Sequence, residues 1–113
     1  MSVPPPAPRS NLSKDGHVYL GALELDVLLG DVRSLAEKRS KVDPVLTELH
    51  RFGVSAAETG ELGRFRRSLF GIAAAGSDID GLHDRLDECE RHIAERQDLE
   101  LLAVRRRIFG PED

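Results

Sequence analysis

The stretch DVRSLAEKRSKVDPVL, residues 31–46, decides the fold, because it forms either one long helix or two pieces broken at Pro44. Its apolar residues fall on one stripe when successive positions advance by about 100° along a helix. Ser34 followed by Glu37 is typical of a capping box at a helix start. Pro44 projects away from the stripe toward water, where a missing backbone N–H is tolerated. We therefore predict one bent helix over residues 34–52.

An alternative interpretation of the same stretch leaves residues 34–43 irregular. A shorter helix then begins with Pro44 in its first turn, where proline is common. In both cases Gly53 marks the end of the helix, because glycine readily adopts positive φ.

Outward from this helix, strand patterns and one further helix pattern follow. Apolar and polar residues alternate in HVYLGALELDVL, residues 17–28, as in a strand with one buried face. The other predicted strands are residues 54–59, 68–75 and 100–109, and a second helix capped by Ser77 runs to about Arg96. The order strand, helix, strand, strand, helix, strand predicts two split crossovers. We expect an α+β, ferredoxin-like βαββαβ fold: a four-stranded antiparallel sheet with two helices on one face.

The length of 113 residues predicts a single domain. Residues 1–16 hold four of the six prolines and few apolar residues, so we predict a disordered Pro-rich tail. The domain then covers residues 17–110, and residues 111–113 form a loose end. Cys89 is the single cysteine, which fits a reducing cytoplasm. The sequence contains no run of about 18 apolar residues, so we expect no membrane-spanning segment.

Basic residues gather in three segments although the formal net charge is −4. The candidate RNA-binding residues are Arg33, Lys38, Arg39, Lys41, Arg64, Arg66, Arg67, Arg105, Arg106 and Arg107. If these segments converge, they can bind phosphates through charge and bidentate hydrogen bonds. The alternative is a solvated surface with ordinary helical ion pairs. The negative total gives no reason to expect DNA or a membrane as a partner.

Candidate catalytic and metal-binding sets are incomplete. Glu24 and Asp26 share a strand face without the further convergent groups that metal binding or acid–base chemistry needs. Cys89 and His92 supply only two of the four ligands that zinc requires. There is also no nucleophile motif and no glycine-rich phosphate loop. We therefore expect a protein that is not an enzyme and has no cofactor.

The second face of the first strand carries apolar residues, namely Val18, Leu20, Ala22 and Leu28. With both helices on one side of the sheet, this face is open to water or to a partner. A homodimer or protein-interaction module is therefore the alternative function. Tyr19 and Phe70 share their faces with aliphatic residues, so we expect them in the core rather than stacked on RNA bases.

Residues 19–58, YLGALELDVLLGDVRSLAEKRSKVDPVLTELHRFGVSAAE, resemble the YlxP family of small bacterial proteins of unknown function. The resemblance is carried by the strand GALELDVLL, by SLAEKR at residues 34–39 and by VSAAE at residues 54–58. The family motif reads Ser-Leu-Lys-Glu-Lys-Arg, so Ala36 replaces one of its basic residues. The likeness continues more weakly into ELLAVRRRIFG and covers about residues 17–110.

The resemblance implies a ferredoxin-like fold and a bacterial cytoplasmic setting. Genes of the YlxP family often lie beside genes for translation initiation and ribosome maturation. We therefore expect a non-enzymatic accessory factor associated with the small ribosomal subunit or its RNA.

Overall fold

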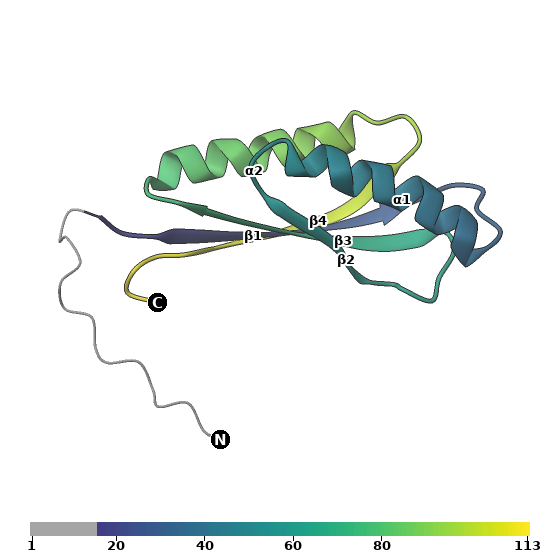
Figure 1. The fold of residues 1–113 in the computed structure, drawn as a ribbon, viewed down its shortest axis with the longest axis horizontal. Helices are drawn as coiled ribbons and strands as arrows, with labels where there is room; N and C mark the ends of the chain where they lie inside the picture. The colour runs from purple at the N-terminus through teal and green to yellow at the C-terminus, as the bar shows by residue number, and fades with distance from the viewer. Residues whose placement is uncertain (1–15) are drawn as a thin grey trace, which may run out of the picture.

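Two helices cover one face of a four-stranded sheet in the computed structural model, which describes residues 16–113 (Figure 1). The elements are β1 (Tyr19–Leu28), α1 (Leu35–His50), β2 (Ser55–Gly60), β3 (Arg67–Gly76), α2 (Ile79–Ala94) and β4 (Glu100–Phe109). This order confirms the predicted ferredoxin-like βαββαβ fold. The predicted disordered tail lies outside the described residues, apart from Gly16. Neither helix within residues 16–113 is long and apolar enough to cross a membrane.

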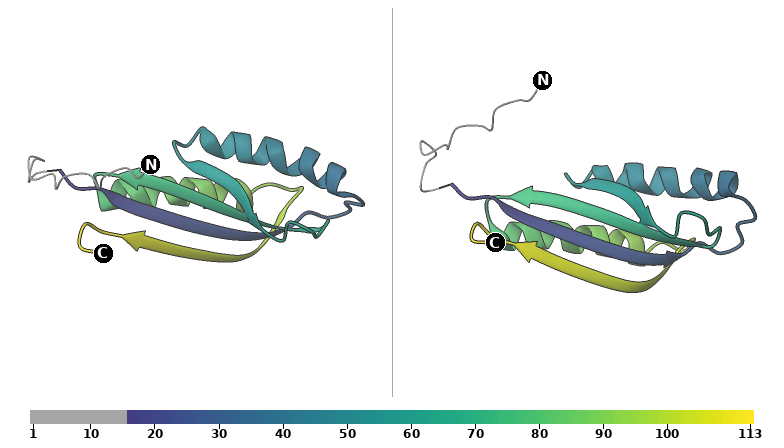
Figure 2. Two further views of the ribbon diagram at one scale, coloured as in Figure 1. Left: turned by 60° about the horizontal axis from the view of Figure 1, so that its bottom comes forward. Right: turned by 90° about the horizontal axis from the view of Figure 1, so that it is seen from below.

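The strands lie in the order β2-β3-β1-β4 and all neighbours are antiparallel (Figure 2). On β1, Leu23 lies opposite Ile72 of β3 and Arg106 of β4. Each helix joins two strands that flank a third one, which is the split crossover expected from the sequence. The face of the sheet away from the helices is open among residues 16–113 (Figure 2, right).

α1 is one continuous helix that runs through Pro44, and Pro44 is exposed. The single-helix prediction is therefore confirmed, and the alternative with a helix starting at Pro44 is wrong. The buried stripe differs from the predicted one, because Lys38 is buried on it and Leu35 is half exposed. Gly53 follows the helix with φ of 75°, as its role as a terminator requires.

The predicted capping box at the start of α1 is present in a shifted form. Ser34 Oγ accepts a hydrogen bond from the amide of Glu37 at 3.1 Å, which satisfies one free helical N–H. The Glu37 carboxylate in turn accepts from the amide of Arg33 at 2.9 Å, one residue before the usual partner. The box therefore also fixes the backbone that carries Arg33.

The cap of α2 lies one residue later than the sequence predicted. Asp78, not Ser77, has the extended backbone of an N-cap, and its carboxylate accepts from the amide of Gly81 at 3.0 Å. A carboxylate is favoured over a hydroxyl at this place because it also meets the positive end of the helix dipole.

The core lies between the sheet and the two helices. Its most buried side chains include Leu23, Leu25, Val27, Phe70, Ile72, Leu82, Leu86, Cys89 and Ile93. Phe70 is therefore a core residue, as predicted, and Tyr19 packs against the same cluster. Burial raises the pKa of Cys89 to about 11, so its thiol stays protonated at neutral pH.

Candidate nucleic-acid interface

Two of the three basic segments meet at the end of the molecule where α1 begins. The β1–α1 connection and the β2–β3 loop lie side by side there, joined by a hydrogen bond from the Leu29 amide to the Arg66 carbonyl at 2.7 Å. Together they line an open hollow of about 580 Å³. Its lining residues are Val32, Arg33, Gly63, Arg64, Phe65, Arg66 and Arg67. We refer to Arg33, Arg64, Phe65 and Arg66 as the arginine end.

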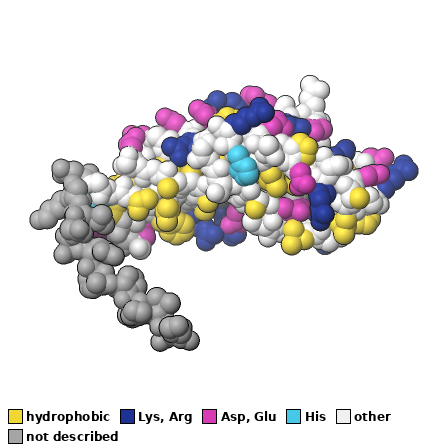
Figure 3. Space-filling view, in the orientation of Figure 1, with side chains coloured by type: hydrophobic (Ala, Val, Ile, Leu, Met, Phe, Trp, Pro, Cys, Tyr) yellow, Lys and Arg dark blue, Asp and Glu magenta, His cyan; other side chains and the backbone are white. Residues whose placement is uncertain are grey.

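The three arginines of the arginine end are exposed and loosely paired. Asp31 lies between two of them, 3.6 Å from Arg33 and 3.4 Å from Arg66, and Arg64 lies 3.1 Å from Glu61. Ion pairs this exposed contribute only about 0–1 kcal/mol. Each guanidinium can therefore exchange its carboxylate for another anion at little cost. Basic, acidic and hydrophobic side chains lie together at this end in Figure 3.

Apolar side chains are exposed among these charges. Phe65 is 42% exposed between Arg64 and Arg66, and Leu62 of the same loop is 61% exposed. The predicted site residues include the arginines of this loop but not Phe65. The available signal was RFR in residues 64–66, an aromatic residue between two basic ones, which is a pattern suited to stacking beside a phosphate.

Lys38 anchors the β2–β3 loop instead of facing solvent. Its side chain is 3% exposed, and its Nζ lies 2.8 Å from the carboxylate of Glu58 and donates to the carbonyl of Glu61 at 2.5 Å. Glu58 also accepts from Ser68 Oγ at 2.6 Å. Glu61 has φ of 60°, a left-handed conformation that a non-glycine residue adopts only when held. Lys38, a predicted RNA-binding residue, is therefore held in the interior, where the Glu58 carboxylate and the Glu61 carbonyl bind its ammonium.

Arg39 and Lys41, the other predicted RNA-binding residues of α1, differ in their surroundings. Arg39 is exposed and lines a small groove of about 110 Å³ together with Leu35 and Leu62, so it lies beside the same β2–β3 loop. Lys41 is exposed and does not line the hollow of the arginine end. The pKa of Asp98 in the α2–β4 connection is lowered, chiefly by its hydrogen bond with Arg96 and to a smaller extent by the charge of Lys41.

Arg67 is the first residue of β3, and its guanidinium is paired with Asp26 of the neighbouring strand β1. Its guanidinium donates to both carboxylate oxygens of Asp26, at 3.2 and 2.7 Å. This bidentate pair raises the pKa of Arg67 and is partly buried, so it exchanges less readily than the pairs of the arginine end.

The third basic segment does not converge with the other two. Successive residues of a strand point to opposite faces, so β4 divides its arginines between the two sides of the sheet. Arg105 and Arg107 both bind Glu24 on the open face, at 2.5 and 3.1 Å, which lowers the pKa of Glu24. Arg106 lies on the helix side, 2.8 Å from Asp87 of α2.

Residues 20–106 match the model of a family described as "Protein of unknown function (DUF503)". The chain belongs to the DUF503 family. A structure titled "De novo designed protein Foldit4" is similar, with a TM-score of 0.50 and 14% sequence identity, over 81% of this chain and 96% of that chain. At this identity the likeness supports the fold alone. No curated protein matches this chain.

The DUF503 match includes the whole arginine end, because both of its segments lie between residues 20 and 106. It also includes Lys38, which holds the loop, and ends one residue before Arg107. The candidate interface is therefore a part of the DUF503 domain and not of the residues that precede it.

Proposed function

We propose that this DUF503 protein is a non-enzymatic accessory factor that binds RNA through the arginine end. The observation that supports the proposal is the meeting of two loops, which brings Arg33, Arg64 and Arg66 around one hollow beside exposed Phe65. Arginine binds phosphate oxygens through two parallel hydrogen bonds, and an exposed aromatic ring offers a surface on which a base stacks.

The binding mode follows from the size of this surface. Three arginines neutralise about three phosphates, and single-stranded RNA then gives a slope of about −2 in log K against log salt. A base stacked on Phe65 adds affinity that salt changes little. The exposed acids Asp31 and Glu61 exchange their arginine partners for water when phosphates bind, which keeps the affinity modest.

The proposed assignment to the cytoplasm and to the small ribosomal subunit rests on the YlxP resemblance. In the proposed setting the protein is cytoplasmic and its RNA belongs to the small ribosomal subunit, either as rRNA in the assembled particle or during maturation. A loop of six residues and one helix start reach a short single-stranded segment or a loop more easily than a long duplex.

Fluorescence anisotropy with a labelled single-stranded RNA tests the proposal. We compare the wild type with the triple variant Arg33→Ala/Arg64→Ala/Arg66→Ala. The control is Lys41→Ala/Arg51→Ala/Arg91→Ala, which removes the same charge from exposed positions elsewhere. We expect the arginine-end variant to lose at least about tenfold in affinity and most of the salt slope. We expect the control to stay within about threefold of the wild type, as for distant charges at moderate salt.

Phe65→Ala separates the stacking contribution from the charge contribution. Loss of one stacked base costs about 1–3 kcal/mol, so affinity should fall by about 5- to 150-fold with an unchanged salt slope. An equal loss in the two triple variants would show that bulk charge alone is responsible. Co-sedimentation with small ribosomal subunits, in which the arginine-end variant should stay in the supernatant, then tests the ribosomal setting.

A further inference from the structure

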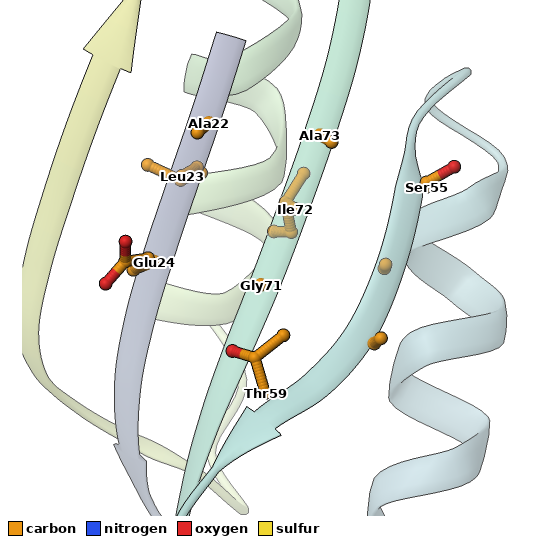
Figure 4. Close-up of a pocket in the computed structure, with 10 residues that line it drawn as sticks. Ala22, Leu23, Glu24, Ser55, Thr59, Gly71, Ile72 and Ala73 are labelled. Atoms are coloured by element: carbon orange, nitrogen blue, oxygen red, sulfur yellow. The ribbon is translucent and has the colours of Figure 1, made fainter.

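The open face of the sheet contains a shallow apolar depression. Two adjoining hollows of about 400 Å³ each extend over β1, β2 and β3, and they share Ala22, Ser55 and Ala73 (Figure 4). The floor consists of small residues, and Thr59 of β2 reaches over Gly71 at one end. No element within residues 16–113 covers this face.

The open face is divided into a half with small side chains and a half with large ones. β2 and β3 present small residues there, including Ser55, Ala57, Gly71, Ala73 and Ala75. β1 and β4 present most of the large ones, including Leu20, Phe109, Arg105 and Arg107, of which Leu20 is 49% and Phe109 40% exposed. Small and large halves lie side by side because the strand order is β2-β3-β1-β4.

Consider a two-fold axis that lies in the interface between two copies and runs parallel to the strands. It places the half with small side chains of one copy against the half with large side chains of the other. Such an axis exchanges β1 with β3 of the second copy, and β4 with β2, at the same level along the strands. Leu20 lies opposite Ala75 in the β1–β3 register, so Leu20 of one copy would then face Ala75 of the other. Arg105 shares a level with Glu24, Gly71 and Ala57, so it would face Ala57 of the second copy.

We propose that the open face binds a second copy of this chain, sheet on sheet, about this axis. Both carboxylates of the face are paired within one copy, Glu24 with Arg105 and Arg107 and Asp26 with Arg67, and one positive charge remains in excess on the edge strand β4. A second copy can therefore cover both carboxylates without leaving either one unpaired, provided that the excess arginine charge stays in water. The arginine stems can lie along the partner while their heads reach the rim.

The area of the face agrees with what a dimer needs. Three of the strands have ten residues and are about 33 Å long, and β2 with six residues is about 20 Å long, so at about 4.8 Å per strand the flat face offers about 570 Å² per copy. Side-chain relief adds to this area, which brings it near the roughly 800 Å² per partner of stable interfaces. The arginine end lies beyond this face, at the start of α1, so the dimer and the proposed RNA contact are independent.

Sedimentation equilibrium of the full chain measures the association. We expect the wild type to approach twice the mass of a single chain as concentration rises. Ala73→Glu places a carboxylate in the centre of the depression and should leave a monomer, with affinity reduced at least about 100-fold by an unpaired buried charge. Ala94→Glu makes the same change on the exposed end of α2 and should associate like the wild type.

Cross-linking tests the axis and does not depend on the folding of Ala73→Glu. Ser55 and Arg107 share one level but lie on the outer strands β2 and β4, so they do not meet within one copy. The axis brings Ser55 of one copy over Arg107 of the other. Packed sheets lie about 10 Å apart, which is too far for a disulfide but within reach of a short bismaleimide linker. This linker should join Ser55→Cys to Arg107→Cys chains in a mixture, whereas it should not join the chains of either variant alone. Buried Cys89 does not compete.

Three results would overturn the proposal. A strictly monomeric wild-type chain would leave the face to a different protein. A dimer that persists in folded Ala73→Glu would place the interface elsewhere. Cross-links within either single-variant sample, without the mixed product, would require a different axis.

Discussion

At the scale of single residues, Lys38 shows how one side chain joins structure to the proposed function. It occupies a place on the buried stripe of α1, and its ammonium binds the Glu58 carboxylate and the Glu61 carbonyl. It therefore fixes the loop that carries Arg64 and Phe65 without being available to a ligand. We describe it as a positioning residue for the arginine end.

Replacing Lys38 by methionine should destabilise the protein. The substitution keeps the apolar stem but leaves the Glu58 side chain, which is 20% exposed, without its cation. Breaking a buried pair on one side costs about 3–5 kcal/mol, and the partial exposure of Glu58 places our expectation near about 3 kcal/mol. Urea denaturation monitored by circular dichroism measures the free energy of unfolding.

Two variants control this prediction. The double variant Lys38→Met/Glu58→Gln should recover much of the lost stability, because the neutral amide leaves no stranded carboxylate and still accepts from Ser68 Oγ. Lys41→Met, on the exposed side of the same helix, should stay within about 0.5 kcal/mol of the wild type. If Lys38→Met were as stable as Lys41→Met, the buried pair would not hold the loop.

At the scale of secondary-structure elements, the N-terminal cap of α2 gives a direct test of which residue stabilises the helix start. The sequence offers Ser77 and Asp78 side by side at the start of α2, and both types of residue are good caps. The structure assigns the role to Asp78 through its bond to the Gly81 amide. Asp78→Ala should therefore lower the unfolding free energy by about 1 kcal/mol, whereas Ser77→Ala should be nearly neutral.

Thermal and urea denaturation of these two variants, compared under identical conditions, give the answer. Both side chains are exposed, so burial does not distort the comparison. A larger loss in Ser77→Ala than in Asp78→Ala would mean that the cap lies at Ser77.

The elements could be predicted because their signals are local. Alternation in residues 17–28, the stripe of α1 and the outward Pro44 each depend on neighbours in the chain. Lys38 could not be placed, because its burial depends on Glu58, which lies 20 residues away on another strand. β4 shows the same limit. The alternation of side chains along a strand predicts that Arg106 and Arg105 lie on opposite faces of the sheet. It does not predict that Arg105 pairs with Glu24 and Arg106 with Asp87.

At the scale of the whole molecule, topology determines which basic segments meet. The β1–α1 connection and the β2–β3 loop are distant in sequence, but β1 and β3 are neighbours in the sheet, so both segments emerge at the same end. The third segment lies within β4 and is divided by the sheet. The sequence therefore identified all three arginines of the arginine end, but it predicted neither their grouping nor the exposure of Phe65 beside them.

The chain presents two separate surfaces as a result. The arginine end is charged, exposed and built from connections, whereas the open face is built from strands and contains an apolar depression. A back-to-back dimer would leave both arginine ends accessible. RNA contact at the arginine end and self-association on the open face can then occur together, and each can be removed without the other.

The most direct test of the central claim maps RNA on the protein itself. We would titrate a short single-stranded RNA into ¹⁵N-labelled protein and follow the backbone amide resonances. We expect the resonances of residues 31–39 and 61–67 to shift, while those of β4 change little. Shifts confined to the open sheet face, or no shifts at low salt, would contradict it.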